Sequence, residues 1–182
     1  RLLPTATVYT SFYREQTFGA TIDPARVRTW PLQRLFGPTD HFRAFLPAYP
    51  VWFSMLDLRD ASLVLSSSIA FTKAVRTSSD AMHISYVYTP VRYAWDLDNY
   101  LQGSSHGRAA RAGARVLRPL LRRWDRATAN RPDVVVAISE TVRERIQRRW
   151  GRDSEVIYPP VNVDEIPVST VDDGYLLVAA RM

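Results

Sequence analysis

Short apolar runs alternate with polar turns along this chain, and most of the runs are rich in β-branched and aromatic residues. Such runs are typical of strands, because these side chains fit the pleated surface of a sheet. Prolines or serines end several of them, since proline cannot donate a hydrogen bond to a neighbouring strand. The pattern predicts strands at Ala6–Tyr13, Val27–Thr29, Ser62–Ser66, Ile84–Tyr88, Val134–Ile138, Glu155–Tyr158 and Tyr175–Ala180.

Helical periodicity appears between these runs. Residues 14–38 have no sustained period and predict a structured loop. The 50–56 segment is apolar nearly all round, which predicts a buried helix. Further helices are predicted after a cap at Asp40, with Phe42, Phe45 and Leu46; at Ala70–Val75; and after Ser139-Glu140, with Val142, Ile146 and Trp150 on one stripe.

The alternation of apolar strands with helices or turns predicts an α/β fold with a Rossmann-like parallel sheet covered on both faces. Ligands of open parallel sheets bind outside the carboxyl ends of the strands. We therefore expect four strand ends to line one crevice. They are Ser66–Ser68, Tyr88–Asp96, Ser139–Glu140 and Tyr158–Pro159.

Composition narrows the classes of function. The chain has no cysteine and three scattered histidines, so disulfides, thiolate chemistry and a histidine-built metal site are not expected. It contains neither a G-x-G-x-x-G nor a Walker motif, and no apolar run long enough for a membrane span. We expect a cytoplasmic protein. Because the sequence starts at Arg1 and stops at Met182, we also expect a piece of a longer chain.

The positive charge is concentrated in one segment. Residues 107–152 carry 13 arginines and 4 acids, whereas the whole chain has a net charge of +6. Arginines at three- and four-residue steps from Arg108 to Arg126 predict a basic amphipathic helix, interrupted near Pro119. Leu117, Leu120, Leu121 and Trp124 form its opposing apolar stripe.

Three interpretations of this basic helix stay open. It can be an ordinary solvated face over a packed stripe. It can contact an anionic membrane surface through Arg111, Arg115, Arg118 and Arg122. It can instead belong to a basic Rossmann-like nucleic-acid-binding module without catalytic activity, although no nucleic-acid motif and no interleaved aromatic side chains support that alternative.

The segment from His83 to Asp96 reads H-I-S-Y-V-Y-T-P-V-R-Y-A-W-D and is the main candidate site. After the strand, Arg92, Tyr93, Trp95 and Asp96 place a cation, two aromatic rings and a carboxylate within five residues, a mixture suited to a polar ligand. The alternative is structural. In that case Tyr93 and Trp95 fill a core, and Arg92 and Asp96 form a surface ion pair.

This segment resembles the H-x-x-Y-x-H-T-P-x-R-Y-x-W-D signature of family 4 glycosyltransferases, in particular bacterial mannosyltransferases of polysaccharide synthesis. Three further stretches resemble family motifs in the same order. They are L-V-L-S-S-S-I-A-F-T-K-A-V at 63–75, V-V-V-A-I-S-E-T-V-R-E-R-I at 134–146 and S-E-V-I-Y-P-P-V-N-V-D at 154–164. The last residues, Y-L-L-V-A-A-R-M, resemble the first strand of that family's second domain.

The resemblance implies the amino-terminal half of the two-domain GT-B architecture. Residues 1–160 would form the acceptor-side domain, 161–174 a linker, and 175–182 the start of a donor-binding domain; the opening strand and most of that second domain would be missing. Family members are retaining, metal-independent enzymes. The implied function is transfer of a sugar, most simply mannose from a nucleotide sugar such as GDP-mannose, to a polysaccharide or lipid-linked saccharide, with no metal cofactor and no nucleic-acid partner.

The resemblance also assigns roles to residues. Tyr88 replaces the family's strand-end histidine and becomes the candidate catalytic residue, and Ile69 and Ser62 are further departures. Arg181 matches an arginine that reaches the donor diphosphate. Because family acceptors are often lipid-linked, the basic helix is expected at the inner face of a membrane. Candidate sugar-binding residues are Thr89, Arg92, Trp95, Asp96, Ser139 and Glu140.

Overall fold

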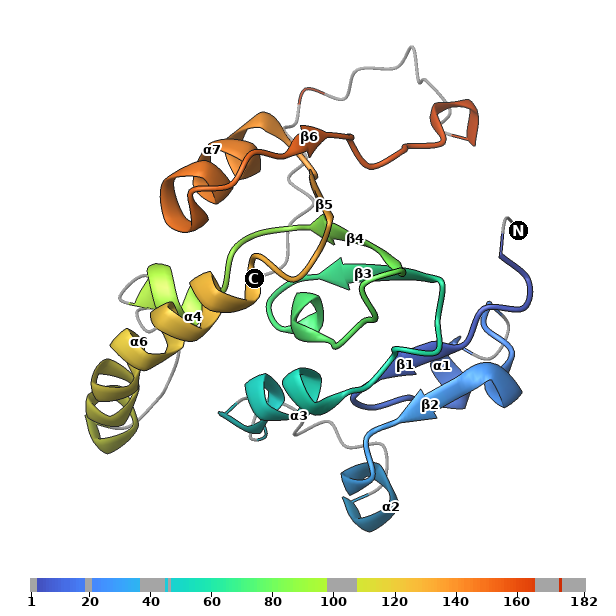
Figure 1. Cartoon of the computed structure of the whole chain (residues 1–182), viewed down its shortest axis with the longest axis horizontal. Helices are drawn as coiled ribbons and strands as arrows, with labels where there is room; N and C mark the ends of the chain where they lie inside the picture. Colours follow the sequence, from blue (N-terminus) through green and yellow to red (C-terminus); the bar gives the residue numbers. More distant parts are fainter. Residues whose placement is uncertain are drawn as a thin grey trace.

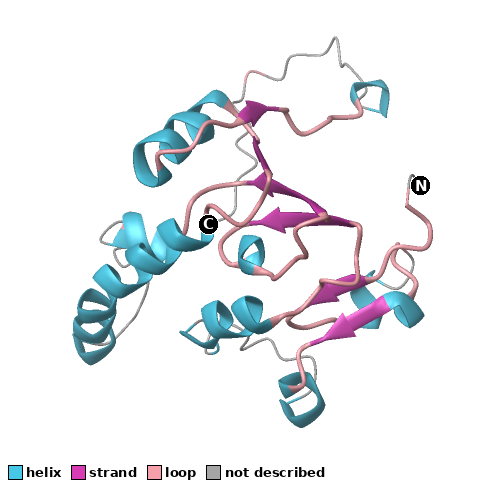
Figure 2. Cartoon of the chain, viewed as in Figure 1, coloured by secondary structure: helices cyan, strands magenta, loops and turns pink. Residues whose placement is uncertain are grey.

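The computed structural model describes residues 3–18, 21–36, 45, 47–97, 108–165 and 174, with the backbone alone at 18, 36, 108–111 and 165. Figures 1 and 2 show its helices arranged around two groups of strands. The predicted helix near Asp40, apart from Phe45, and the predicted strand Tyr175–Ala180 lie outside the described residues.

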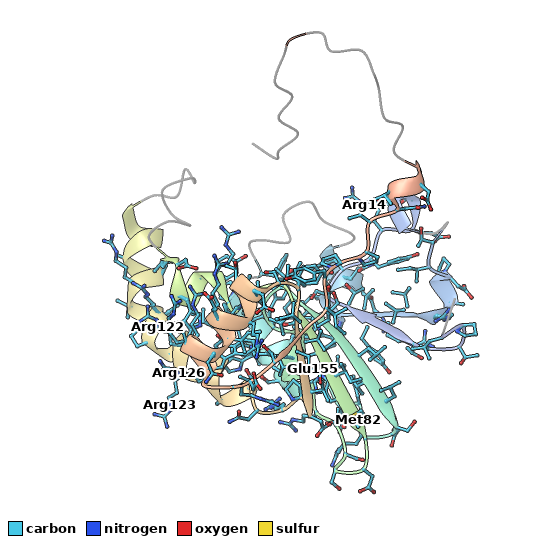
Figure 3. All side chains as sticks on the ribbon, turned by 90° about the horizontal axis from the view of Figure 1, so that it is seen from above. Arg14, Met82, Arg122, Arg123, Arg126 and Glu155 are labelled. Carbon is cyan, nitrogen blue, oxygen red and sulfur yellow. The ribbon has the colours of Figure 1, made fainter. Side chains whose placement is uncertain are left out.

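The larger sheet has four strands in the order β3 (Leu63–Ser68), β4 (Met82–Val87), β5 (Val134–Ala137) and β6 (Glu155–Val156), all parallel. In Figure 3, Met82 and Glu155, the first residues of β4 and β6, lie toward the same end of this sheet. The α/β class with a parallel sheet is therefore confirmed. The serines at 66–68 belong to β3 itself, where each pairs with a residue of β4.

The smaller sheet pairs β1 (Val8–Thr10) with β2 (Val27–Thr29) in parallel. Residues 14–38 were predicted to be a loop, but three short helical segments occur there. Asp23 caps one of them by accepting a hydrogen bond from the backbone of Ala25, the type of local bond that sequence periodicity does not reveal. These segments are α1 (Glu15–Phe18), η1 (Pro24–Arg26) and α2 (Leu32–Phe36).

Helix α7 (Glu140–Trp150) connects β5 to β6. Ser139 caps it by accepting a hydrogen bond from the backbone N–H of Val142, and Gly151 ends it at φ 70°, a conformation that glycine adopts without strain. The other helices are α3 (Tyr49–Met55), α4 (Arg92–Trp95) and α6 (Arg108–Thr128). Two 3₁₀ segments follow β3 and β6, η3 (Thr72–Ala74) and η4 (Val163–Glu165).

Several predicted helices differ in detail. Only η3 forms within 70–75, so the longer helix predicted there is wrong. Helix α3 buries Tyr49 and Phe53 but exposes Val51 and Met55, so it is buried on one side rather than all round. Helix α6 runs through Pro119 without the predicted interruption. Arg118 and Arg122, on either side of that proline, bond the Ala94 carbonyl oxygen and hold α6 against α4.

The predicted apolar stripe of α6 is only partly buried. Leu121 and Trp124 pack against the main core cluster, which includes Phe53, Val64, Phe71 and Ala94. Leu117 and Leu120 are 53% and 66% exposed. The interpretation of this helix as a solvated face over a packed stripe therefore holds for Leu121 and Trp124 but not for the two exposed leucines.

The larger sheet is covered mainly on one face. His83, Ser85 and Val87 of β4 share that face with Val64 of β3, and all four are buried. On the opposite face, Leu63, Leu65 and Met82 are exposed. Among the described residues, the expectation of a sheet covered on both faces is therefore wrong at β3.

A groove of about 750 Å³ lies beside this open face. It is lined by β1, including Val8 and Tyr9, and by β3 from Leu63 to Ser67. In the described part of the chain, β1 pairs with β2 and β3 with β4, so the strand edges that face the groove are unpaired. No described helix combines the length and apolarity needed to span a bilayer.

Candidate functional site

The carboxyl ends of the four larger-sheet strands are aligned. Ser68 pairs with Val87, Val87 with Ala137, and Ala137 with Val156. Backbone hydrogen bonds continue past the strands, because Tyr88 N donates to Ser68 O at 2.9 Å and Ile157 N to Ala137 O at 3.1 Å. We call this row of strand ends the carboxyl edge; it brings the strand ends into one row, while the crevice that they were expected to line stays a prediction.

Tyr88 lies at the middle of the carboxyl edge. Its side chain is 39% exposed and meets Tyr86 edge-on, with ring centroids 5.6 Å apart. The Tyr86 hydroxyl donates to the Ile157 carbonyl oxygen at 2.8 Å, which ties β4 to the segment after β6. Tyr88 therefore presents an accessible phenol on a supported ring, able to donate or accept a hydrogen bond.

The other polar residues of this edge have local partners. The Thr89 hydroxyl donates to the Pro90 carbonyl oxygen at 3.2 Å. Ser139 caps α7, and Glu140 is exposed and lies 3.6 Å from Arg143. Ser139 and Glu140 open a helix whose N-terminal N–H groups carry partial positive charge.

Trp95 and Asp96 point elsewhere. Asp96 accepts two hydrogen bonds from Arg149 Nη2, at 3.0 and 2.9 Å, and the Trp95 indole N–H donates to Asp125 at 2.7 Å. Both partners belong to the helices α6 and α7. Arg92 is exposed, and Asp96 pairs with Arg149, so the surface ion pair considered between Arg92 and Asp96 does not form. The structure thus separates Tyr88 and Thr89 at the edge from Trp95 and Asp96 among the helices.

A buried charged network lies behind Trp95. Lys73 Nζ is 2.6 Å from Asp125 Oδ1, and both side chains are essentially inaccessible. Asp125 Oδ2 accepts indole N–H groups from Trp95 and Trp150, each at 2.7 Å. Burial lowers the pKa of Lys73, and the Asp125 carboxylate opposes this by favouring the charged form. The network joins the segment after β3 to α4, α6 and α7.

Sequence reasoning gave no role to Lys73, Asp125 or Arg149. One signal was present, because Lys73 is the only lysine beside 23 arginines. A single lysine in an arginine-rich chain indicates a position where a slender ammonium group fits and a guanidinium does not. The partners Asp125 and Trp150 are far from it in sequence, and no local pattern connects them.

The arginines predicted to contact a membrane surface differ in their surroundings. Arg118 and Arg122 donate through Nε to the Ala94 carbonyl oxygen, at 3.1 and 2.8 Å, so both turn toward α4. Arg115 is exposed, while the Arg111 side chain and Arg181 lie outside the described residues. Within the described part of the chain, no three acidic or histidine side chains gather as a metal site would require.

The aligned strand ends define an α/β protein with a parallel sheet, a class of fold in which ligands commonly bind outside the carboxyl ends of the strands. The chain belongs to glycosyltransferase family 4, because the family model described as Glycosyltransferase Family 4 matches residues 6–165. The four motif stretches at 63–75, 83–96, 134–146 and 154–164 lie inside this range, and the final stretch, Y-L-L-V-A-A-R-M, lies beyond it. Comparisons with curated proteins and with solved structures found no significant match.

Proposed function

We propose that this chain is the acceptor-side domain of a retaining glycosyltransferase with GT-B architecture. The observation that carries the proposal is the carboxyl edge, with an accessible phenol at its centre, in a chain that matches family 4 over most of its length. Residues 1–160 form the acceptor-side domain, 161–174 the linker, and 175–182 begin the donor-binding domain. The donor is a nucleotide sugar and the acceptor a saccharide.

The proposed reaction breaks the bond between the sugar C1 and the diphosphate oxygen, and the electron pair leaves with the diphosphate. The acceptor hydroxyl oxygen forms the new bond to C1, and its proton leaves with the nucleoside diphosphate. The protein contributes by aligning the two reactants and by stabilising the developing negative charge. Tyr88 orients the transferred sugar or the acceptor hydroxyl, and Arg181 contacts the donor diphosphate through two parallel hydrogen bonds.

We propose mannose as the sugar and GDP-mannose as the donor, with no metal cofactor, on the resemblance of the 83–96 segment to bacterial mannosyltransferases. The acceptor is a growing polysaccharide or a lipid-linked saccharide. Exposed Val116, Leu117 and Leu120 on the basic helix α6 support a location at an anionic membrane surface. Such a helix binds the interface through apolar burial together with cationic attraction.

A transfer assay tests this proposal. The enzyme that carries this chain is incubated with labelled GDP-mannose, UDP-glucose or UDP-galactose, together with saccharide and polyprenyl-linked acceptors. We expect transfer from GDP-mannose, with retained anomeric configuration by NMR and with an unchanged rate in EDTA. Transfer from a different donor would overturn the mannosyl assignment alone, and inverted configuration would overturn the retaining mechanism. The absence of transfer from every donor would overturn the proposed function.

A further inference from the structure

Three arginine side chains gather around a single indole among the helices, apart from Tyr88 and Thr89 at the carboxyl edge. The guanidinium carbons of Arg122, Arg126 and Arg149 lie 5.0, 4.9 and 5.7 Å from the centroid of the Trp95 ring. Two of them come from α6 and one from the end of α7. Figure 3 shows Arg122 and Arg126 along the same side of the molecule.

Backbone carbonyl groups hold these guanidinium groups in place. Arg122 Nε donates to Ala94 O at 2.8 Å, and Arg126 Nε donates to Arg149 O at 3.0 Å. In the described part of the chain, neither arginine has an acceptor for its terminal nitrogens. Each side chain is thus anchored at Nε, while the fork that recognises oxyanions is left for a ligand.

Among the described residues, this cluster has more positive charges than carboxylates in contact with it. Asp96 is the carboxylate that contacts it, through Arg149. Asp125 lies nearby, but Lys73 and two indole N–H groups already occupy its oxygens. Burial and, after it, the neighbouring guanidinium groups of Arg118, Arg126 and Arg149 lower the pKa of Arg122. Its positive charge is therefore less favourable here than on an isolated exposed side chain.

One nitrogen donor of the cluster has no acceptor among the described residues. Arg149 uses Nη2 for Asp96, whereas its Nη1 is buried without a hydrogen-bond partner. A buried polar group without a partner is unfavourable, and native proteins rarely keep one without a reason. An oxyanion at the cluster would supply negative charge and acceptor oxygens together.

We propose that Arg122, Arg126 and Arg149, stacked around Trp95, form a binding site for a phosphate group. Guanidinium groups that come from two helices and lie around one indole ring offer several donors, and a tetrahedral oxyanion offers acceptor oxygens in several directions. The same chemistry can be presented by a phospholipid headgroup or by soluble phosphate or diphosphate. None of the site's residues lies at the carboxyl edge, so the proposed phosphate site is a different place from the edge that carries Tyr88.

The experiment measures binding of pyrophosphate and inorganic phosphate to this chain by isothermal titration calorimetry at low salt. It also measures co-sedimentation with vesicles of phosphatidic acid or phosphatidylglycerol at matched surface charge. The test variant is Arg126→Gln, since Arg126 is exposed and its loss leaves the core intact. The matched control is Arg123→Gln, which removes an equal charge from the neighbouring turn of α6 at an exposed residue outside the cluster.

We expect Arg126→Gln to weaken binding at least tenfold and Arg123→Gln to weaken it less than twofold. Arg122→Lys keeps the charge but loses the fork, so we expect an intermediate loss. Saturable binding of pyrophosphate with this pattern identifies a soluble phosphate ligand. The same pattern confined to phosphatidic acid vesicles identifies a lipid headgroup with a phosphate monoester.

Equal losses in Arg126→Gln and Arg123→Gln would overturn the site, because net charge alone would then explain the binding. So would the absence of binding in both arms. A duplex DNA competitor provides a further check: tight duplex binding that both variants weaken equally would indicate a general polyanion surface and would overturn the site as well. Circular dichroism of each variant confirms that the fold is retained.

Discussion

At the scale of single residues, Asp125 is the buried acceptor at the centre of a charged network. Its two carboxylate oxygens accept hydrogen bonds from Lys73, Trp95 and Trp150, all at 2.6 or 2.7 Å. The Lys73 ammonium also lies 4.9 Å from the ring centroids of Trp124 and Trp150. A buried ion pair gives little net stability, but removal of one partner leaves an uncompensated charge.

We therefore expect Asp125→Asn to lower the free energy of unfolding by about 3–5 kcal/mol, because Lys73 would keep a buried charge without its counterion. Urea unfolding followed by circular dichroism measures this change. Asp153→Asn is the matched control, since that carboxylate is 88% exposed and its loss should cost no more than about 0.5 kcal/mol. Equal unfolding midpoints for the two variants would show that the network contributes nothing to stability.

His83 adds a dependence on pH. It is fully buried, its Nε2 lies 2.9 Å from the Ser66 hydroxyl, and burial lowers its pKa from 6.5 to about 4, with Asp133 opposing the shift. The unfolded chain thus takes up the proton at a higher pH than the folded chain. Protonation favours unfolding, so stability is full above pH 6.5 and falls as the pH drops toward 4.

The expected loss is about 2–3 kcal/mol between pH 7 and pH 4. Urea unfolding at several pH values measures it. His83→Asn should flatten this slope because the titrating group is gone. Asp57→Asn should not, since that carboxylate pairs with Arg59 and its pKa of about 2 lies below the window. A slope that persists in His83→Asn would assign the pH dependence to other groups.

At the scale of elements, α6 has two chemically different sides. One side turns Arg118 and Arg122 toward the Ala94 carbonyl oxygen. The other exposes Val116, Leu117 and Leu120, three apolar side chains within five residues of a basic helix. This second side is the part of the chain that we expect to enter a membrane interface.

The double variant Leu117→Ser with Leu120→Ser should therefore bind anionic vesicles several-fold more weakly, because about 1 kcal/mol or more of apolar burial is lost for each leucine. Its unfolding midpoint should be nearly unchanged, since both residues are exposed. Vesicle co-sedimentation measures the binding. Leu121→Ser is an informative comparison, because Leu121 packs on the core and its loss should lower stability instead. Unchanged vesicle binding by the double variant would show that these leucines do not enter a membrane, and α6 would then be an ordinary solvated helix.

The elements also show what sequence patterns can predict. The strands β2, β4 and β5 and the helix α7 were predicted nearly to their bounds, because each combines a clear apolar period with a strong stop such as Pro90 or a cap such as Ser139. Continuity of α6 through Pro119 was not predicted, since it depends on contacts with α4. The open face of β3 was also missed, because an apolar run does not show which of its faces is covered.

The candidate site was predicted unevenly for a similar reason. The positions of Tyr88 and Ser139 at one edge follow from parallel strands, a property that the sequence shows. The contacts of Asp96 with Arg149 and of Trp95 with Asp125 join residues 30 or more positions apart. Local composition indicated that Trp95 and Asp96 have polar or charged partners. The packing of the helices determines that these partners are Asp125 and Arg149.

At the scale of the whole molecule, three features occupy different places. The carboxyl edge with Tyr88 is the proposed site of sugar transfer, the arginine cluster around Trp95 is the proposed phosphate site, and the exposed side of α6 is the proposed membrane contact. The buried Lys73–Asp125 pair connects the first two, because Trp95 bonds Asp125 and Lys73 follows β3. Family 4 membership accounts for the four motifs between residues 63 and 164.

The central claim, that the carboxyl edge performs sugar transfer, is tested most directly by the rate of transfer in two tyrosine variants of the enzyme that carries this chain. Tyr88→Phe removes one exposed hydroxyl at the edge, and Tyr9→Phe removes a similarly exposed hydroxyl on β1. We predict that Tyr88→Phe lowers kcat/KM roughly 10- to 100-fold, the effect of losing one hydrogen bond to a charged or reacting group, while Tyr9→Phe transfers sugar like the parent. Parent-like transfer by Tyr88→Phe would contradict the account.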